Sequence, residues 1–289
     1  MSATSAGEAS FDDRLEQSLK DIGIPPRPAI LDQISAEMKR DDPDVKRLSV
    51  LIGTDVALSA SLIKTANSPF FGTRGRVRSV SEALMALGLR LAGTAIAGIV
   101  LRRLFPSSPT MERFWDASAS IARVSGWLVQ QQSQIKVNAD DAYTYGLFRD
   151  CGIPVLMIKF PAYAATLANA NRDAGHSFTQ VEEQFLPTNH AIVGCLLARS
   201  WWLPEELCLA IRYHHDEQRL ANPSAGMLPK SLQLVAVGQL AEYLLQSRTG
   251  LSQTMEWEKL GPVCLQLLGL DADQLPELLI AATDVIDEA

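Results

Sequence analysis

The stretch DDPDVKRLSVLIGTDVALSASLIKTANSPFFG, residues 41–72, contains two consecutive patterns of apolar residues at helical spacing. The first apolar stripe consists of Val45, Leu48, Leu51 and Ile52. The second stripe follows Asp55, a predicted N-cap, and consists of Leu58, Leu62 and Ala66. Shortly afterwards, Ser79 and Glu82 have the spacing of a capping box that opens a third helix. Amphipathic helices in succession favour an all-α fold.

The second half of the chain repeats this helical pattern. We expect one helix to begin beyond an Asp140 cap and to stop at Gly152, because glycine commonly terminates helices. Another is expected to begin at a capping box formed by Thr179 and Glu182. No run of residues alternates convincingly with a period of two, as a half-buried strand would. The predicted class is therefore all-α, with many helices.

A break near residues 105–110 is the expected internal boundary, because Pro106 and Pro109 interrupt the helical pattern there. We expect an N-terminal helical subdomain over 11–107 and a C-terminal helical subdomain over 108–289. The small polar residues 1–10 are expected to form a disordered tail. The last 60 residues look helical and are expected to complete the fold, without an assigned function.

The net charge of −7 argues against general nucleic-acid binding, which needs a basic face. Four widely spaced cysteines and a polar, acidic start without a signal peptide predict a cytoplasmic protein with reduced thiols. The most apolar run, residues 91–101, is too short to span a bilayer. We interpret this run as part of a buried core helix and expect no membrane association.

The residues that could carry catalysis are few. Of the four histidines, His214 and His215 are expected to flank a helix C-terminus, where partly charged imidazole is favoured. The spacing of the histidines supplies no metal-binding pair within one helix, so only the fold could bring them together. No nucleophile elbow, phosphate-binding loop or dinucleotide motif is present. These residues alone predict no active site.

The segment YGLFRDCGIP, residues 145–154, places the charged pair Arg149 and Asp150 at a helix end. Adjacent residues on a helix do not face each other, so we expect the two to have different partners. A buried aspartate needs hydrogen-bond donors, which a histidine such as His190 could supply. Two interpretations stay open: a structural polar network, or a pocket in which Arg149 binds a phosphate or carboxylate ligand.

The order of motifs resembles the HDOD family, the HD-related output domains of bacterial signalling proteins. The resemblance covers about residues 20–217 and is carried by IPPRPAI (24–30), by residues 41–72 and by VRSVSEALMALGL (77–89). It continues through the elements GLFRDCG, NHAIVGCLLARSWWLPEEL and AIRYHHD. The family implies a multi-helical fold in which an N-terminal helical subdomain packs on a degenerate HD-like subdomain.

HD-superfamily phosphohydrolases hold metal with a histidine, a His-Asp dipeptide and a later aspartate. The resemblance places Ala117 at the first position, Arg149 and Asp150 at the dipeptide, and Gln239 or a neighbour at the last. His190, His214 and His215 match family positions outside this core ligand set, and with Ala117, Arg149 and Asp150 they are candidate residues of a degenerate pocket. Because only one of the four core ligands is retained, we expect a vestigial site with no metal and no cofactor.

The resemblance therefore implies a non-catalytic signal-transduction module that acts through protein–protein contact, in pathways with two-component regulators or cyclic dinucleotides. The partners would be separate signalling proteins, and the oligomeric state is left open. Two alternatives remain. One is a sensor of a nucleotide or another anion through Arg149, and the other is a divergent metal-dependent phosphohydrolase.

Overall fold

A computed structural model describes residues 22–71, 76–222 and 226–287, and these residues form helices and no strand. The expected disordered tail at residues 1–10 lies outside them. The helices of the first part are α2 (Ala29–Met38), α3 (Val45–Gly53), α4 (Val56–Ala66), η1 (Pro69–Phe71) and α5 (Val80–Arg103). The second part begins with α6 (Pro109–Gln131), α7 (Ala139–Phe148), α8 (Gly152–Lys159), α9 (Tyr163–Arg172) and α10 (Phe178–Glu183). It continues with α11 (His190–Ser200), α12 (Glu205–Tyr213), α13 (Glu217–Ala221), α14 (Pro229–Thr249), α15 (Glu256–Leu268), η2 (Ala272–Gln274), α16 (Leu275–Ala281) and α17 (Thr283–Asp287). The predicted all-α class is confirmed.

Side-chain caps begin several helices where the sequence predicts them. Asp55 caps α4 by accepting a hydrogen bond from the backbone N–H of Leu58, and Ser79 caps α5 in the same way. The capping box predicted for α5 forms only in part, because the Glu82 carboxylate accepts from the backbone N–H of Arg78 instead of that of Ser79. Two predicted caps are wrong. Asn138 instead of Asp140 caps α7, because the Asn138 amide oxygen accepts from the N–H of Asp141.

The second wrong cap is that of α10. Its capping box is formed by Ser177 and Gln180 instead of Thr179 and Glu182. The Glu182 side chain is fully buried, because it turns inward and contacts His190. A carboxylate used in this way cannot also reach back to cap its own helix.

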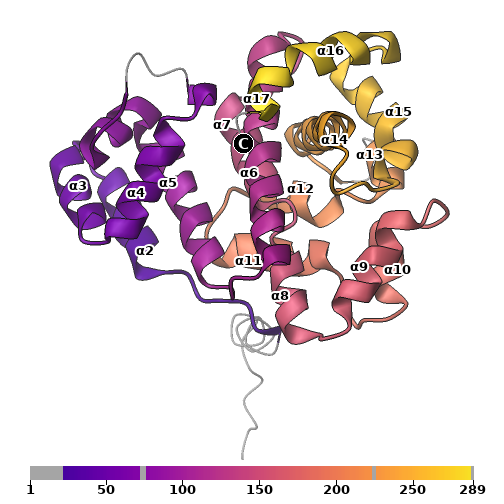
Figure 1. Cartoon of the computed structure of the whole chain (residues 1–289), viewed down its shortest axis with the longest axis horizontal. Coiled ribbons are helices and arrows are strands. Elements are labelled where there is room, and N and C mark those ends of the chain that lie inside the picture. The colour runs from indigo at the N-terminus through magenta and orange to yellow at the C-terminus, as the bar shows by residue number, and fades with distance from the viewer. Residues whose placement is uncertain (1–21, 72–75, 223–225, 288–289) are drawn as a thin grey trace, which may run out of the picture.

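The first five helical elements lie together on one side of the molecule, with α5 between them and the rest (Figure 1). Helix α5 packs on α2, α3 and α4, and its other side contacts α7. Gly88 interrupts its helical geometry with a φ of 71°, so two helical segments meet at a kink. By length and composition alone, α5 is the one helix of the described residues that could cross a membrane. A core helix passes the same test, and the contacts of α5 agree with the predicted core position.

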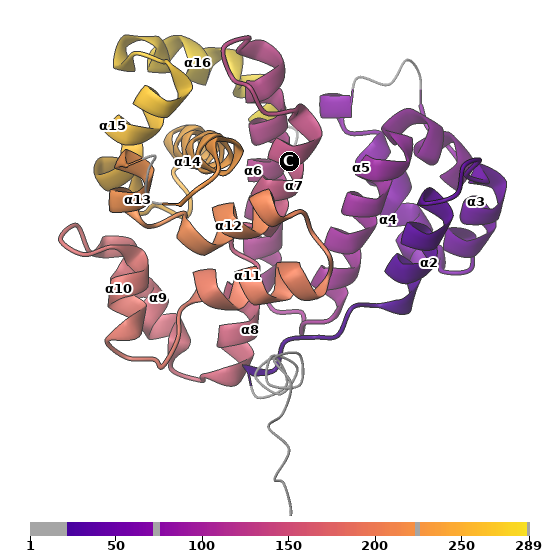
Figure 2. The same ribbon diagram turned by 180° about the vertical axis from the view of Figure 1, so that it is seen from behind.

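Helices α6, α7 and α14 form the centre of the second group (Figures 1 and 2). Helix α14 packs on α6, α7, α12 and α15, while α11 packs between α8 and α12. One connected hydrophobic core runs through both groups of helices. The loop between α5 and α6 coincides with the expected boundary, and the division into two subdomains stays a prediction.

Gly152 marks the closest approach of two helices in this region. It is the first residue of α8, so the expectation that it ends the preceding helix is wrong; that helix, α7, ends at Phe148. A Cβ atom at Gly152 would lie 2.1 Å from the backbone oxygen of His190 and 2.7 Å from the backbone nitrogen of Gly194. Glycine is needed here because the backbone of α8 touches that of α11.

Candidate functional site

Four side chains from three parts of the chain converge on one point. Asp150 lies in the turn between α7 and α8, His190 is the first residue of α11, and His214 and His215 directly follow the last residue of α12. One potential ligand atom from each side chain lies within 4.8 Å of all the others. These four were candidates from the family resemblance. Ala117 lies on α6, and its methyl group offers no ligand atom.

The centre of this His/Asp cluster, defined by Asp150, His190, His214 and His215, is compact. The Oδ1 atom of Asp150 is 3.2 Å from Nε2 of His214 and 3.6 Å from Nε2 of His190. The Nε2 atoms of His190 and His214 are 3.2 Å apart. The expectation that a histidine such as His190 approaches Asp150 agrees with this geometry.

The second ring nitrogen of each histidine is held from outside the cluster. Nδ1 of His190 lies 2.8 Å from Oε2 of Glu182, and Nδ1 of His214 lies 2.8 Å from the backbone oxygen of Ile211. Nδ1 of His215 contacts the Glu256 carboxylate, while its Nε2 has no hydrogen-bond partner although it is buried. All three imidazoles therefore present Nε2 to the centre.

The electrostatic surroundings set the charge of each histidine. Burial lowers the pKa of His214 and holds that of His215 well below its usual range. Burial also opposes the charged form of His190, but Glu182 and Asp150 outweigh it and raise its pKa. His214 and His215 do flank the C-terminus of α12 as expected, but their burial disfavours the charged form that the expectation assumed.

Arg149 is fully enclosed and lies directly beside this cluster. Its Nη1 atom is 3.0 Å from Oε2 of Glu242 and 3.3 Å from the backbone oxygen of Gly238, and its Nη2 atom is 3.3 Å from Oε1 of Gln239. Its Nε atom lies 3.5 Å from Oδ2 of Asp150. The expectation of separate partners thus fails in part, because the two neighbours also form an ion pair.

The pKa values of this pair follow from the same contacts. Burial disfavours both charges, but Glu242 and Asp150 raise the pKa of Arg149 above its usual range. Arg149, followed by His214, likewise lowers the pKa of Asp150 below its usual range. Both side chains are therefore charged. Gln239, which the resemblance placed at the last ligand position, does lie at this site through its contact with Arg149.

Sequence reasoning missed three carboxylates that support the site: Glu182, Glu242 and Glu256. Glu242 could have been found, because it lies three residues after Gln239 and therefore on the same helix face. Glu182 accepts hydrogen bonds from the Tyr163 hydroxyl and from the backbone N–H of His190. No local pattern distinguishes Glu182 or Glu256 from solvent-exposed glutamates.

A polar hollow of about 740 Å³ opens beside the cluster. His215 and Glu256 are part of its wall, whereas Asp150, His190 and His214 are not. The remaining wall includes His176 and charged side chains of both signs, namely Arg212, Arg219, Lys259, Glu183, Asp216, Glu217 and Glu258. Solvent therefore approaches the cluster from the side of His215.

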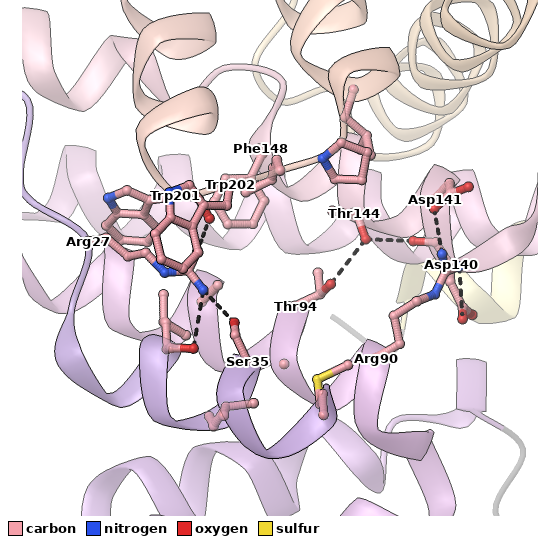
Figure 3. A pocket seen from close by; sticks show the side chains of 18 residues that line it. Arg27, Ser35, Arg90, Thr94, Asp140, Asp141, Thr144, Phe148, Trp201 and Trp202 are labelled. Atoms are coloured by element: carbon pink, nitrogen blue, oxygen red, sulfur yellow. Dashed lines mark hydrogen bonds and ion pairs between the residues drawn. The ribbon is translucent and has the colours of Figure 1, made fainter. Parts of the chain in front are cut away.

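A second, smaller hollow of about 180 Å³ lies between the two groups of helices. Figure 3 shows Arg27 and Trp202 at one end of it and Arg90 with Asp140 at the other. Trp202 is 64% exposed, its φ is 62°, and its ring lies 4.4 Å from the Arg27 guanidinium carbon. Its neighbour Trp201 is buried.

Comparisons with known proteins agree with this architecture. The HDOD domain model matches residues 24–217. An HDOD domain protein of unknown function from Geobacter sulfurreducens is 22% identical, with a TM-score of 0.68 and coverage of 96% of this chain and 97% of that one. A Shewanella amazonensis protein with the provisional name phosphohydrolase is 22% identical, with a TM-score of 0.69 and coverage of 95% and 96%.

Two further comparisons extend to longer proteins. A Marinobacter aquaeolei protein with the provisional name signal transduction protein is 22% identical, with a TM-score of 0.65 and coverage of 93% of this chain and 60% of that one. An uncharacterized protein from Treponema pallidum is 26% identical over 209 residues, which is 72% of this chain and 39% of that protein. This chain therefore spans about two fifths of the length of that relative.

Proposed function

Since the chain belongs to the HDOD family, we propose that it is a non-catalytic signalling module that acts by contact with another protein. One observation carries the non-catalytic part of the proposal. The buried Arg149 guanidinium lies against Asp150, and the Glu242 carboxylate neutralises its charge within the protein. The provisional name of the Marinobacter aquaeolei neighbour supports a signalling role.

Phosphoester hydrolysis at a metal needs an open coordination position for water and access for the substrate. The Oδ2 atom of Asp150 lies 3.5 Å from Nε of Arg149, and Asp150 is not part of the wall of the polar hollow. The four cysteines of the chain are buried, and burial raises their pKa values, so none supplies a thiolate nucleophile. These features favour a structural pocket over a catalytic one.

The alternative of an anion sensor at Arg149 is not favoured by the geometry. The Arg149 side chain is 2% exposed, and its terminal nitrogens are already directed at Glu242, Gln239 and Gly238. An incoming phosphate would have to displace the Glu242 carboxylate and bury its own charge, which is costly.

The contact surface that we propose is centred on Trp202. A large aromatic side chain that is mostly exposed and borders a hollow is typical of a binding hot spot. The apolar part of the hollow includes Leu31, Ile34, Met38, Leu203 and Pro204. A partner protein that places one apolar side chain beside Trp202 would cover both the ring and the hollow.

The proposed lack of catalysis is tested by measuring hydrolysis of a phosphomonoester and of a panel of cyclic nucleotides and dinucleotides, with Mg²⁺, Mn²⁺ or Zn²⁺ added. Any turnover should be equal in the wild type and in Asp150→Ala, because contaminating phosphatases do not depend on this residue. Turnover that Asp150→Ala abolishes would overturn the proposal.

The contact part is tested by crosslinking in cells, identification of the enriched protein, and measurement of its affinity for the purified chain. We expect Trp202→Ala to weaken binding at least tenfold, as removal of a hot-spot aromatic does. Phe185→Ala is the matched control, because Phe185 is similarly exposed at 61% and does not border this hollow. Equal losses in the two variants, or no loss in Trp202→Ala, would contradict the assigned surface.

A further inference from the structure

We propose that Asp150, His190, His214 and His215 bind one divalent transition-metal ion of the zinc class. The proposal departs from the sequence-based expectation of no metal, which counted only one retained ligand. It is independent of the proposed function, because a module that acts by contact can contain a metal ion or lack one.

The first argument is the direction of the hydrogen bonds. The Ile211 carbonyl oxygen can only accept, so the proton of neutral His214 is on Nδ1. Glu182 takes hydrogen bonds from the Tyr163 hydroxyl and a backbone N–H, so it also acts as an acceptor toward Nδ1 of His190. In the neutral form of His190, the Nε2 atoms of both rings then direct lone pairs at each other, and a metal ion would replace the second proton that Glu182 and Asp150 favour on His190.

The same reasoning applies to the third ring. The Glu256 carboxylate lies against Nδ1 of His215 and also against the Lys259 ammonium group, so it too is an acceptor. The buried Nε2 of His215 is left without a partner. With the three rings neutral, three lone pairs and the Asp150 carboxylate surround one point, and a divalent cation there would satisfy all four at once.

The second argument is the spacing of the ligand atoms. In a tetrahedral zinc site with bonds of about 2.0–2.2 Å, neighbouring ligand atoms are about 3.3–3.6 Å apart. The three distances among Asp150 Oδ1, His190 Nε2 and His214 Nε2 are 3.2, 3.2 and 3.6 Å. They already form one face of such a tetrahedron. The fourth atom, on His215, lies within 4.8 Å of the others, so it would have to approach them by about 1 Å to complete the tetrahedron.

The third argument is the balance of charge. The Arg149 guanidinium is paired with Glu242, and the Lys259 ammonium is paired with Glu256. Arg149 also contacts Asp150, so its one positive charge is shared between two carboxylates, and Glu182 contacts no Lys or Arg side chain among the described ion pairs. Two such carboxylates match a divalent cation. The Arg149 guanidinium repels a cation bound at Asp150, and the Glu242 carboxylate beside it reduces this repulsion.

The outer contacts complete the pattern of a metal site. Metal-binding histidines usually donate their second N–H to a carboxylate or a backbone carbonyl, which fixes the ring and its tautomer. Here Glu182, Ile211 and Glu256 supply these acceptors for the three rings. With four protein ligands the ion has no position left for water, as in structural zinc sites. The proposed ion therefore stabilises the junction of α8, α11 and α12 without making the module an enzyme.

The test uses the full chain without a histidine tag, stripped with a chelator and then titrated with Zn²⁺ and with Co²⁺. We expect one ion per chain, an increase in melting temperature, and the intense visible absorption of tetrahedral Co²⁺. Asp150→Asn and His215→Ala should each weaken Zn²⁺ binding at least tenfold, whereas His176→Ala should not, because His176 is an exposed histidine outside the cluster.

Circular dichroism of the metal-free variants checks that they are folded, and the nearly isosteric Asp150→Asn variant covers the case in which His215→Ala fails to fold. The proposal is overturned if the folded wild-type chain takes up no stoichiometric Zn²⁺, or if His176→Ala lowers uptake as much as the cluster variants do. Turnover that depends on Asp150 would instead refute the proposed function and leave metal binding standing.

Discussion

Replacing Gly152 with alanine should force apart the two helices that hold the cluster. The new Cβ atom would lie 2.1 Å from the backbone oxygen of His190, whereas carbon and oxygen atoms in contact are at least about 3.3 Å apart. The backbone nitrogen of Gly194, at 2.7 Å, blocks a second direction. Helix α8 or α11 must therefore move by about 1 Å, because the obstructing atoms are backbone atoms that cannot rotate away.

Overpacking of a rigid core costs about 1–3 kcal/mol, and obstruction by backbone on more than one side places this variant at the upper end, at about 3 kcal/mol. The measurement is the urea midpoint by circular dichroism, with the m value compared between variants. His190 is the first residue of α11, so Gly152→Ala should also weaken Zn²⁺ binding.

Gly53→Ala is the matched control, because it also adds one methyl group to a helical glycine. No heavy atom lies within 4 Å of that Cβ, so this variant should be between neutral and about 1 kcal/mol more stable than the wild type. A Gly152→Ala protein as stable as the wild type would refute the close packing of α8 on α11.

Three further predictions concern the interior. Arg149→Met should lower the free energy of unfolding by about 3–5 kcal/mol, because it leaves Glu242 buried without its partner. In a double-mutant cycle, adding Glu242→Gln should recover much of this loss, and additive losses would contradict the ion pair. Burial raises the pKa of Cys208 and Cys264 to about 12, so iodoacetamide at pH 8 should label these thiols only after denaturation, and rapid labelling of the native protein would show that they are accessible. Replacing the buried Trp201 with alanine should lower the free energy of unfolding by about 3–5 kcal/mol, and replacing the exposed Trp202 should lower it by less than about 1 kcal/mol. Urea unfolding measures both, and similar losses would contradict the different burial of the two rings.

The helical class and several helix starts could be predicted from the sequence because they depend on local physics. Asp55 and Ser79 cap helices through hydrogen bonds to residues three positions away, and such contacts are visible in the spacing alone. The family resemblance likewise identified Asp150 and the histidines as neighbours, although their spacing along the chain gives no indication of it.

The wrong predictions concern residues whose position depends on contacts with distant parts of the chain. Glu182 has the sequence context of a capping residue, but its contact with His190 depends on how α10 and α11 pack. Gly152 has the sequence context of a helix stop. Glycine is needed there because the backbone of Gly194, 42 residues later in the chain, lies too close for a side chain. Long-range packing decides both positions, and no local pattern encodes it.

The contacts of Arg149 also bear on where a functional fragment of this chain can end. The family match stops at residue 217, yet Gly238, Gln239 and Glu242, which bind the guanidinium, all belong to α14. Glu256, at the start of α15, holds His215 in the same way. A fragment cut at the family boundary would expose the core face of α12 and leave a buried cation beside Asp150 without its main counter-ion. The unit that folds is thus longer than the unit that sequence families delimit, and expression or domain-fusion designs should retain the chain through α15.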